Sequence, residues 1–251
     1  MTQRYKAVLA YDGAAYSGWQ VQPRMRTIQS ECQNALERIT GESVHIHSSG
    51  RTDTGVHAHG QVAHFDLTRG RDPDRLMIGL NAVLDADIRF TSIVPVNPDF
   101  HARFSAVRKE YRYMIWNDRF VPPHLRHYRL QYSRALDLEP MRVAAARLVG
   151  RHDFASFCSS RGGGDDNTVR NLLALDVLQD GREYTVVALG EGFLYKMVRS
   201  LTGFLIRVGT GVLEPKDADR LLHTRKRSAV VPCAKPHGLF LWRVDYPEDI
   251  N

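Results

Sequence analysis

The segment from Gly50 to Ala58, GRTDTGVHA, holds the residues whose types and spacing best suit chemistry. Two glycines bracket its centre and allow a sharp backbone path, and Arg51 and Asp53 stand two residues apart. If the chain is extended there, both side chains leave the same face, so a guanidinium and a carboxylate project together from a loop. A carboxylate in such a place can act as a nucleophile or take up a proton. The alternative is a turn in which Asp53 only caps its own backbone.

Histidines crowd around this segment and indicate a second candidate chemistry. Those nearest to it in sequence are His45, His47, His57, His59 and His64. Imidazole pairs on strands are metal ligands in some hydrolases. Their spacing matches no metal signature, because neither H-E-x-x-H nor a set of cysteines accompanies it. A metal-dependent hydrolase or nuclease therefore stands as the enzymatic alternative.

The elements that must position these residues follow from the hydrophobic periodicity. In the first part of the chain it predicts helices behind Thr27 as N-cap and at Pro73, and strands around them. The expected strands are 5–11, 44–48, 61–67 and 88–96, and the expected helices are 28–39 and 73–83. Their order is β-α-β-β-α-β, and the GRTDTGVHA segment lies between the second and third strands.

A similar order begins again after Phe100. Here the expected strands are 110–116, 172–178, 185–189 and 239–246, and the expected helices are 138–149, 193–208 and 217–223. The pattern predicts an α+β fold of two similar halves, residues 1–104 and 105–251, each with a mainly antiparallel sheet flanked by helices.

The composition is that of a soluble protein. The apolar stretches are far shorter than the roughly 20 residues of a membrane-spanning helix, and no secretory signal is evident. The three cysteines, Cys32, Cys158 and Cys233, are far apart and form no C-x-x-C motif, which favours a reducing compartment. We therefore expect a cytoplasmic protein.

The charge balance is compatible with a polyanionic partner and equally with an ordinary charged surface. The chain has 34 basic and 28 acidic residues, a net charge of +6, and arginines recur in short clusters. Arginine binds phosphate through a planar fork of donors. The clusters are either a polyanion-binding surface or merely solvated faces of loops and helices.

The GRTDTGVHA segment resembles the catalytic motif of the TruA family of tRNA pseudouridine synthases, commonly G-R-T-D-A-G-V-H. Thr54 departs from that pattern, since the family commonly has alanine there. Other motifs similar to those of the family follow in the same order along almost the whole chain. They are YDG, Y and GWQ within 11–20, FHARF at 100–104, YRY at 111–113, DFASF at 153–157, GFL and MVR within 192–199, and GL and VDYP within 238–247.

The resemblance implies an isomerase that converts uridine to pseudouridine at positions 38 to 40 of the tRNA anticodon stem-loop. It implies no metal, nucleotide cofactor or energy source. It also implies a homodimer in which the tRNA contacts both subunits, and a catalytic cleft between the two halves of the chain.

Three residues are similar to catalytic positions of the family. Asp53 is the expected nucleophile or base. Arg199 lies opposite the apolar arc of the helix expected over 193–208, and the resemblance implies that it pairs with Asp53 across the two halves and keeps the carboxylate ionised. Tyr111 is expected to stack on the target uracil and to help remove its C5 proton.

Four more residues are expected to bind the RNA. The target uridine must be turned out of the stem at a cost of a few kcal/mol, and the resemblance implies that Arg51 occupies the vacated space and holds the adjacent phosphate. Leu239 is expected to cover the other side of the base. We also assign Lys196 and Arg103 to substrate binding.

A non-catalytic RNA-binding protein is the second alternative, because paired α+β sheets with exposed aromatic residues are also typical of RNA-recognition modules. Asp53 discriminates between the two, since a phosphate-binding surface gains nothing from a carboxylate at its centre. The run 159–167 matches no motif, and both a flap over the RNA and a long connection are open.

Overall fold

The computed structural model describes residues 2–159, 167–226 and 229–248. Its contacts divide the chain into two compact units. Unit 1 comprises Met1–Arg108 and Phe240–Asn251, and unit 2 comprises Lys109–Leu239. Unit 2 is therefore an insertion, in sequence, between two segments of unit 1. The run 159–167, whose role the sequence left open, lies almost entirely outside the described residues.

Unit 1 is built on a mainly antiparallel sheet. Its strands are β1 (Gln3–Tyr11), β2 (His47–Ser48), β3 (His57–Leu67), β4 (Ile88–Val96) and β10 (Leu239–Asp245), the last belonging to unit 1 from Phe240 onward. β1 lies between β4 and β3 and is antiparallel to both. Ala58 of β3 pairs with Tyr11 of β1 on one side and with Leu241 of β10, in parallel, on the other. β3 is thus fixed on both sides directly after residues 50–56.

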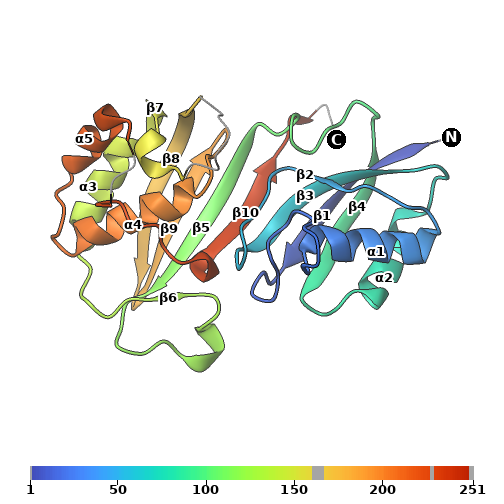
Figure 1. The fold of residues 1–251 in the computed structure, drawn as a ribbon, viewed down its shortest axis with the longest axis horizontal. Helices are drawn as coiled ribbons and strands as arrows, with labels where there is room; N and C mark the ends of the chain where they lie inside the picture. Colours follow the sequence, from blue (N-terminus) through green and yellow to red (C-terminus); the bar gives the residue numbers. More distant parts are fainter. Residues whose placement is uncertain (1, 160–166, 227–228, 249–251) are drawn as a thin grey trace. The chain divides into compact units, whose positions relative to one another are not determined.

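Helices α1 (Ile28–Thr40) and α2 (Pro73–Val83) lie side by side against one face of this sheet (Figure 1). Thr27 caps α1 in a capping box, and Gly41 ends it in the left-handed conformation at φ 75°. Asp72 caps α2, and a proline opens the helix, where its missing N–H costs nothing. Both helices of unit 1 therefore begin at a residue whose side chain caps them.

Unit 2 contains further strands, most of them antiparallel to their neighbours, and further helices. In sheet order its strands are β5 (Arg108–Trp116), β9 (Glu183–Gly190), β8 (Val169–Asp180) and β7 (Gly150–Asp153), and β6 (Leu130–Gln131) pairs in parallel with β5. Its helices are α3 (Leu138–Leu148), α4 (Met197–Gly209) and α5 (Asp217–Thr224), with 3-10 turns at Pro123–Leu125, Ala155–Phe157 and Pro236–Gly238. α3 packs against β8, α4 and α5. In the core the rings of Phe157 and Phe204 meet edge to face at 5.8 Å.

The predicted α+β class is confirmed, since each unit has a mainly antiparallel sheet and helices packed on it. The helices expected over 28–39, 73–83, 138–149 and 217–223 are present, with ends within one residue of the prediction. No helix in the described part of the chain is long and apolar enough to cross a membrane.

The strand expected over 44–48 is shorter than predicted, because only His47 and Ser48 pair with β3. Before His47, the backbone groups of Ile46 pair with side chains of α1 and not with a neighbouring strand. The amide of Gln29 donates to the carbonyl of Ile46 at 2.9 Å, and Gln33 accepts from its N–H at 3.4 Å. The alternation of buried residues was a correct observation, but it does not reveal which groups satisfy the backbone.

The helix expected over 193–208 begins at Met197 instead of Phe193. Lys196 has a left-handed backbone with φ 60°, which an α-helix cannot continue through. Upstream of it, the ring of Phe193 packs against Tyr111 of β5 at 5.1 Å. The apolar spacing of 193–197 therefore serves tertiary packing and not a helical turn.

The strand pairing adds features that periodicity did not predict. β3 starts at His57, earlier than the expected residue 61, and β6 and β7 were not expected. The last strand, which the sequence grouped with residues 105–251, pairs with β3 of unit 1.

Candidate active site

Residues 50–56 form the loop between β2 and β3, here called the Asp53 loop. Arg51 is exposed, Thr52 is buried and Asp53 is half-buried. This alternation is that of an extended chain, in which side chains two residues apart leave the same side. The hydroxyl of Thr52, which points the other way, lies 2.8 Å from the hydroxyl of Tyr11 in β1.

The backbone of the Asp53 loop is held at three places. The carbonyl of Gly50 accepts from the side-chain amide of Gln61 at 2.9 Å, and the carbonyl of Thr52 accepts from the N–H of Trp19 at 3.1 Å. The carbonyl of Asp53 then accepts from the N–H of Val56 at 3.1 Å and closes a turn. The backbone is therefore held by hydrogen bonds both before and after the Asp53 side chain, at the carbonyl groups of Thr52 and Asp53.

Two glycines of the segment after β1 allow this close support. A Cβ atom at Gly13 would lie 2.0 Å from the carbonyl oxygen of Val56. A Cβ atom at Gly18 would lie 2.7 Å from the carbonyl oxygen of Thr52, and Gly18 has φ 84° besides. Only glycine fits at either position, because real Cβ atoms do not approach carbonyl oxygens so closely. Residues 11–20 thus form a backing for the Asp53 loop.

A buried polar network joins this backing to the sheet. The hydroxyl of Ser49 donates to Gln61 Oε1 at 2.8 Å, and the amide of Gln61 donates to the Tyr11 hydroxyl at 3.4 Å as well as to the loop. Burial raises the pKa of Tyr11 well above its ordinary value, so the phenol stays neutral. The network therefore positions the loop and does not exchange protons with it.

The end of the loop is fixed by a buried imidazole. His57 stacks on Phe240 of β10 with ring centroids 4.7 Å apart, and its Nδ1 lies 3.0 Å from the N–H of Gly13 and 3.1 Å from a carboxylate oxygen of Asp12. The sequence analysis listed His57 among metal candidates, whereas here it ties β3 to the segment after β1.

In unit 2, Arg199 is held by backbone contacts. Its Nε donates to the carbonyl of Ala234 at 2.7 Å, and its own carbonyl accepts from the N–H of Ala234 at 3.0 Å. One turn further along α4, a Cβ atom at Gly203 would lie 1.9 Å from the carbonyl oxygen of Pro232. The face of α4 expected to lie opposite the core is therefore covered by residues 231–234.

Tyr111, the other expected catalytic residue of unit 2, is buried in β5 opposite Ala188 of β9. Its ring meets that of Phe193 at 80°, with centroids 5.1 Å apart. A second contact of the same region involves Tyr113, whose hydroxyl donates to the carbonyl of Lys235 at 2.7 Å. β5 thus helps to hold the segment that covers Arg199.

The expected RNA-binding residues lie in both units. Arg51 and Arg103 are exposed in unit 1, with the guanidinium of Arg103 5.6 Å from the ring centroid of Phe104. In unit 2, Lys196 is half-buried with its Nζ 4.8 Å from the Tyr195 ring centroid, and Leu239 is buried at the start of β10. Arg51 and Asp53 belong to the same loop of unit 1. The expected ion pair between Asp53 and Arg199 would join the two units, and it stays a prediction.

The sequence analysis missed the residues that support the Asp53 loop. They are Gly13, Gly18, Thr52, Tyr11 and Gln61. The motif residues 11–13 and 18–20 carried a signal, since glycines recur there beside aromatic residues without any helical or strand period. Gln61 carried none, because it stands in a strand whose alternation it does not disturb.

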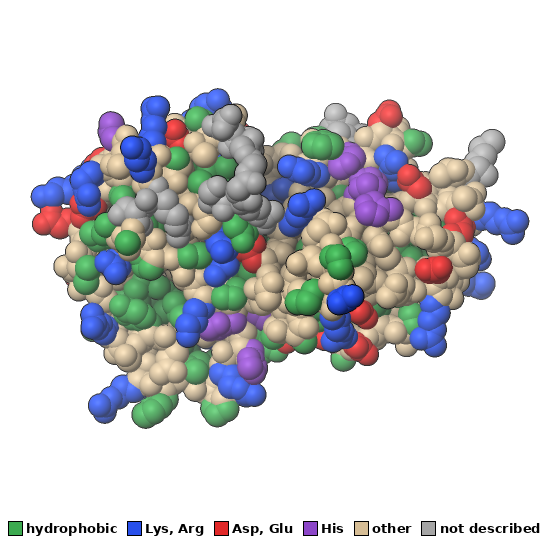
Figure 2. All heavy atoms as spheres, viewed as in Figure 1, with side chains coloured by type: hydrophobic (Ala, Val, Ile, Leu, Met, Phe, Trp, Pro, Cys, Tyr) green, Lys and Arg blue, Asp and Glu red, His purple; other side chains and the backbone are tan. Residues whose placement is uncertain are grey.

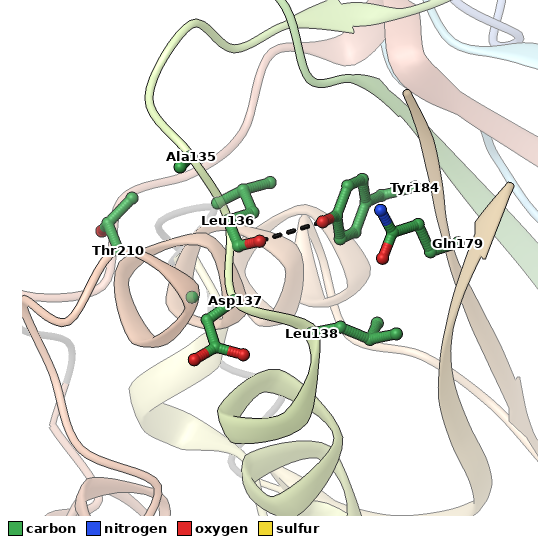
Figure 3. A pocket seen from close by; sticks show the side chains of 8 residues that line it. Ala135, Leu136, Asp137, Leu138, Gln179, Tyr184 and Thr210 are labelled. Carbon is green, nitrogen blue, oxygen red and sulfur yellow. Dashed lines mark hydrogen bonds between the residues drawn. The ribbon is translucent and has the colours of Figure 1, made fainter. Parts of the chain in front are cut away.

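The structure offers no preformed metal centre among the described residues, which contain no group of three or more His, Cys, Asp or Glu side chains that could hold an ion. It does contain a depression in unit 2, lined by Leu136, Asp137, Gln179, Tyr184 and Thr210 among others (Figure 3). There the hydroxyl of Tyr184 donates to the carbonyl of Leu136 at 2.9 Å. None of the expected site residues lines this depression.

The model of a tRNA pseudouridine synthase family matches residues 7–105 and 144–247 of the chain. The chain belongs to this family. It is 45% identical over 246 residues to tRNA pseudouridine synthase A of Listeria monocytogenes serotype 4a, covering 97% of this chain and 99% of the relative. It is 44% identical over 253 residues to the protein of the same name from Chlamydia muridarum, covering 98% of this chain and 93% of the relative.

One solved structure shows only a distant likeness to this chain. The chain matches part of a structure described as a Cbf5-Nop10-Gar1 complex at 14% identity, with a TM-score of 0.36 and coverage of 80% of this chain and 54% of that one.

Membership confirms the prediction of a tRNA pseudouridine synthase, an isomerase that acts on uridine in tRNA. The matched ranges contain the Asp53 loop with its backing, and also Arg199 with the residues that cover it. Tyr111 lies in the interval between the two matched ranges.

Proposed function

We propose that this enzyme isomerises uridine at positions 38, 39 and 40 of the tRNA anticodon stem-loop, with Asp53 as nucleophile or base. The observation that carries the proposal is the place of Asp53, half-buried on a loop whose neighbours Thr52 and Val56 are fixed to the rest of unit 1. A catalytic carboxylate must be held within a fraction of an ångström of the reacting atom, and this support provides such a position.

The reaction asks for little besides a positioned carboxylate. The bond from C1' to N1 breaks, a bond from C1' to C5 forms, and one proton passes from C5 to N1, so that no electrons are gained or lost. Asp53 either attacks the nucleoside, at C1' or at C6, or removes a proton in an elimination. An isomerisation with this balance needs no redox cofactor and no energy source.

Arg199 is the proposed partner of Asp53. A guanidinium close to a half-buried carboxylate favours its ionised form, which both candidate roles need. The bond from Nε to Ala234 fixes the plane of the guanidinium within unit 2. We propose that its terminal amino groups face the carboxylate of Asp53 in the active enzyme.

The remaining site residues handle the RNA. Tyr111 offers a flat apolar ring with one titratable oxygen, suited to stacking on the uracil and to taking part in the removal of the C5 proton. Leu239 covers the other side of the base. Arg51 replaces the base that has been turned out of the stem, and Lys196 and Arg103 bind phosphate.

We further propose a cytoplasmic homodimer, with the tRNA contacting both subunits. Cys32, Cys158 and Cys233 are free thiols, as expected in a reducing compartment.

The test is the modification of an unmodified tRNA transcript with uridine at positions 38, 39 and 40, mapped by carbodiimide treatment and primer extension. The expected result is pseudouridine at these positions. Asp53→Asn should lower the rate at least about 1,000-fold while tRNA affinity changes little, because the amide cannot attack or accept the proton. Asp74→Asn, an exposed carboxylate of the same unit, is the matched control and should change neither.

Each alternative function has its own result in this experiment. An RNA-binding protein without activity would bind the transcript and form no pseudouridine. Loss of activity in EDTA with full recovery by a divalent ion would favour a metal-dependent enzyme. Loss of binding with retained turnover in Asp53→Asn would contradict the catalytic role of this carboxylate.

A further inference from the structure

Five aromatic rings form a continuous row in unit 1, here called the ring row. They belong to His45, His47, His64, His101 and Phe104. Successive centroids are 4.4 Å apart from His45 to His47, 4.8 Å to His64, 4.6 Å to His101 and 4.4 Å to Phe104. The rings come from three separate segments of the chain: the residues at β2, the strand β3, and the turn after β4. The fold therefore brings these rings together from segments that are far apart in the sequence.

The row is open to solvent on one side. Phe104 is 75% exposed, His45 and His47 are also exposed, and His64 is buried beneath them. Histidine side chains gather on the visible face of unit 1 in Figure 2. Covering a phenyl ring this exposed with a ligand is favourable, because apolar surface is then removed from water.

Three imidazoles of the row, those of His47, His64 and His101, favour the neutral form near neutral pH. Burial, together with the neighbouring imidazoles and Arg4, lowers the pKa of His64 to about 4, and burial first of all lowers the pKa values of His47 and His101. Nδ1 of His64 accepts from the N–H of Ala102 at 3.2 Å, so the neutral ring carries its proton on Nε2. Neutral heteroaromatic rings stack on nucleobases without desolvating a charge.

The charges around the row include one cation suited to phosphate. Arg4 of β1 is paired with Asp66 of β3 at 2.8 Å, and the Nζ of Lys6 lies over the rings of Phe100 and Tyr246. Asp99 lies near Arg4 as well. Arg103 is exposed beside Phe104 and makes no ion pair with a carboxylate in the described part of the chain. A phosphate can therefore meet Arg103 at the end of the row.

We propose that the ring row binds unpaired nucleotides of the tRNA substrate, away from the uridine that reacts. Bases stack on Phe104 and on the exposed imidazoles, and Arg103 binds the phosphate of a stacked nucleotide. Stacking of bases on aromatic side chains, combined with arginine contacts to the backbone, is how proteins hold single-stranded RNA. The inference rests on the proposed function for the identity of the RNA, and it adds a second contact to it.

RNA fits the ring row better than a second protein chain does. Four of the five rings are imidazoles, which are heteroaromatic and polar at the edge, whereas the residues enriched at protein interfaces are Tyr, Trp, Phe, Met and Arg. The cation beside Phe104 complements the charge of a phosphate. A second copy of this chain is kept as an outcome of the test.

The test compares Phe104→Leu with a matched control, Phe120→Leu. Phe120 lies in unit 2, is 80% exposed and belongs to no ring pair among the described residues. Both variants lose a phenyl face and keep an apolar side chain. Dissociation constants for the unmodified tRNA transcript are measured by filter binding, with KM and kcat measured alongside.

Phe104→Leu should raise Kd and KM about 5- to 100-fold, the value of one stacked base, with kcat changed far less. Phe104→Trp should restore affinity, and Phe120→Leu should bind as the original enzyme does. For a fully paired RNA of the same length, Phe104→Leu and the original enzyme should bind alike, because no base is free to stack.

Equal affinity of Phe104→Leu and the original enzyme for the transcript would overturn the inference. So would an equal loss on the fully paired RNA, or conversion of a dimer to a monomer by Phe104→Leu in light scattering, which would assign the row to a second copy. The proposed function has a separate test, which is the formation of pseudouridine at positions 38 to 40 by the original enzyme. Its absence would contradict the proposed function whatever the effect of Phe104→Leu on binding.

Discussion

The loop that carries Asp53 in unit 1 and the helix that carries Arg199 in unit 2 are both supported by a backbone that approaches a glycine. In unit 1 the glycines, Gly13 and Gly18, belong to the supporting segment, and the side chains of Tyr11 and Gln61 add hydrogen bonds. In unit 2 the glycine, Gly203, belongs to the helix itself, and the support comes from the backbone of residues 232–234.

The difference follows from the kind of element in each place. A helix already satisfies its own backbone groups, so one close neighbour is enough to orient a side chain on it. A loop leaves its backbone groups open, so each must find a partner before the loop has one conformation. A reactive side chain on a loop therefore depends on more residues than one on a helix.

Gly13→Ala should have the largest effect. Its Cβ atom would meet the carbonyl oxygen of Val56 at 2.0 Å, so the Asp53 loop must shift, and a displacement of about 1 Å can lower kcat about 100-fold. Single-turnover kinetics with tRNA measure it. Gly70→Ala is the control, since its nearest neighbour would be the Tyr5 hydroxyl at 3.9 Å. Full activity of Gly13→Ala would show that the backing does not set the position of Asp53.

Gly203→Ala should have a smaller effect, about 10-fold on kcat, because the segment at Pro232 has to move but the helix that carries Arg199 does not. Thermal unfolding should also show a loss of about 1–3 kcal/mol from overpacking. Gly79→Ala in α2 is the helical control, since its Cβ atom would lie no closer than 3.4 Å to Ile39, and alanine favours a helix. A larger kinetic loss for Gly203→Ala than for Gly13→Ala would reverse the comparison.

Thr52→Val should cost about 1 kcal/mol, or roughly fivefold in kcat/KM, because it removes one hydrogen bond to Tyr11 and keeps the shape of the side chain. Tyr11→Phe removes the same bond from the other side. A double-mutant cycle in kcat/KM should give a coupling of about 0.5 kcal/mol or more. Additive losses would mean that the two hydroxyls act on the loop independently.

The smallest effect concerns the stability of unit 1 in acid. His64 has a pKa lowered to about 4 by burial, against about 6.5 when unfolded, so protons bind to the unfolded chain first. Its contribution is present above pH 6.5 and is lost as the pH falls toward 4. The melting temperature should drop by roughly 2–4 °C for each kcal/mol lost, and His64→Gln should flatten this decline. An identical pH dependence in the variant would exclude His64 as its source.

Local patterns predicted much of this molecule. The spacing of Leu36 and its neighbours in α1, and the starting residues Thr27 and Pro73, define helices that depend on a few adjacent residues. The pairing of β10 with β3 depends on contacts between residues almost 200 positions apart, and no period within either strand encodes it. Lys196 shows the same limit at one residue, because the apolar spacing around it does not indicate its left-handed backbone.

For the site, the reaction was predicted because the motif around Asp53 resembles the catalytic motif of a known family, whereas the residue types alone left a turn-capping role for Asp53 open. The supporting role of Gln61 could not be predicted, since it looks like an ordinary strand residue until β1 and β3 are placed side by side. The functional roles of Asp53, Tyr111 and Arg199 remain predictions that kinetics must decide.

The place of β10 has a consequence for synthesis on the ribosome. β10 comes from the last part of the chain yet pairs with β3 directly behind the Asp53 loop. As translation proceeds from the N-terminus, unit 2 is fully made before unit 1 receives its last strand. The nascent chain therefore leaves the edge of β3 at His57 and Ala58 without its β10 neighbour for the whole time that residues 109–239 are being added.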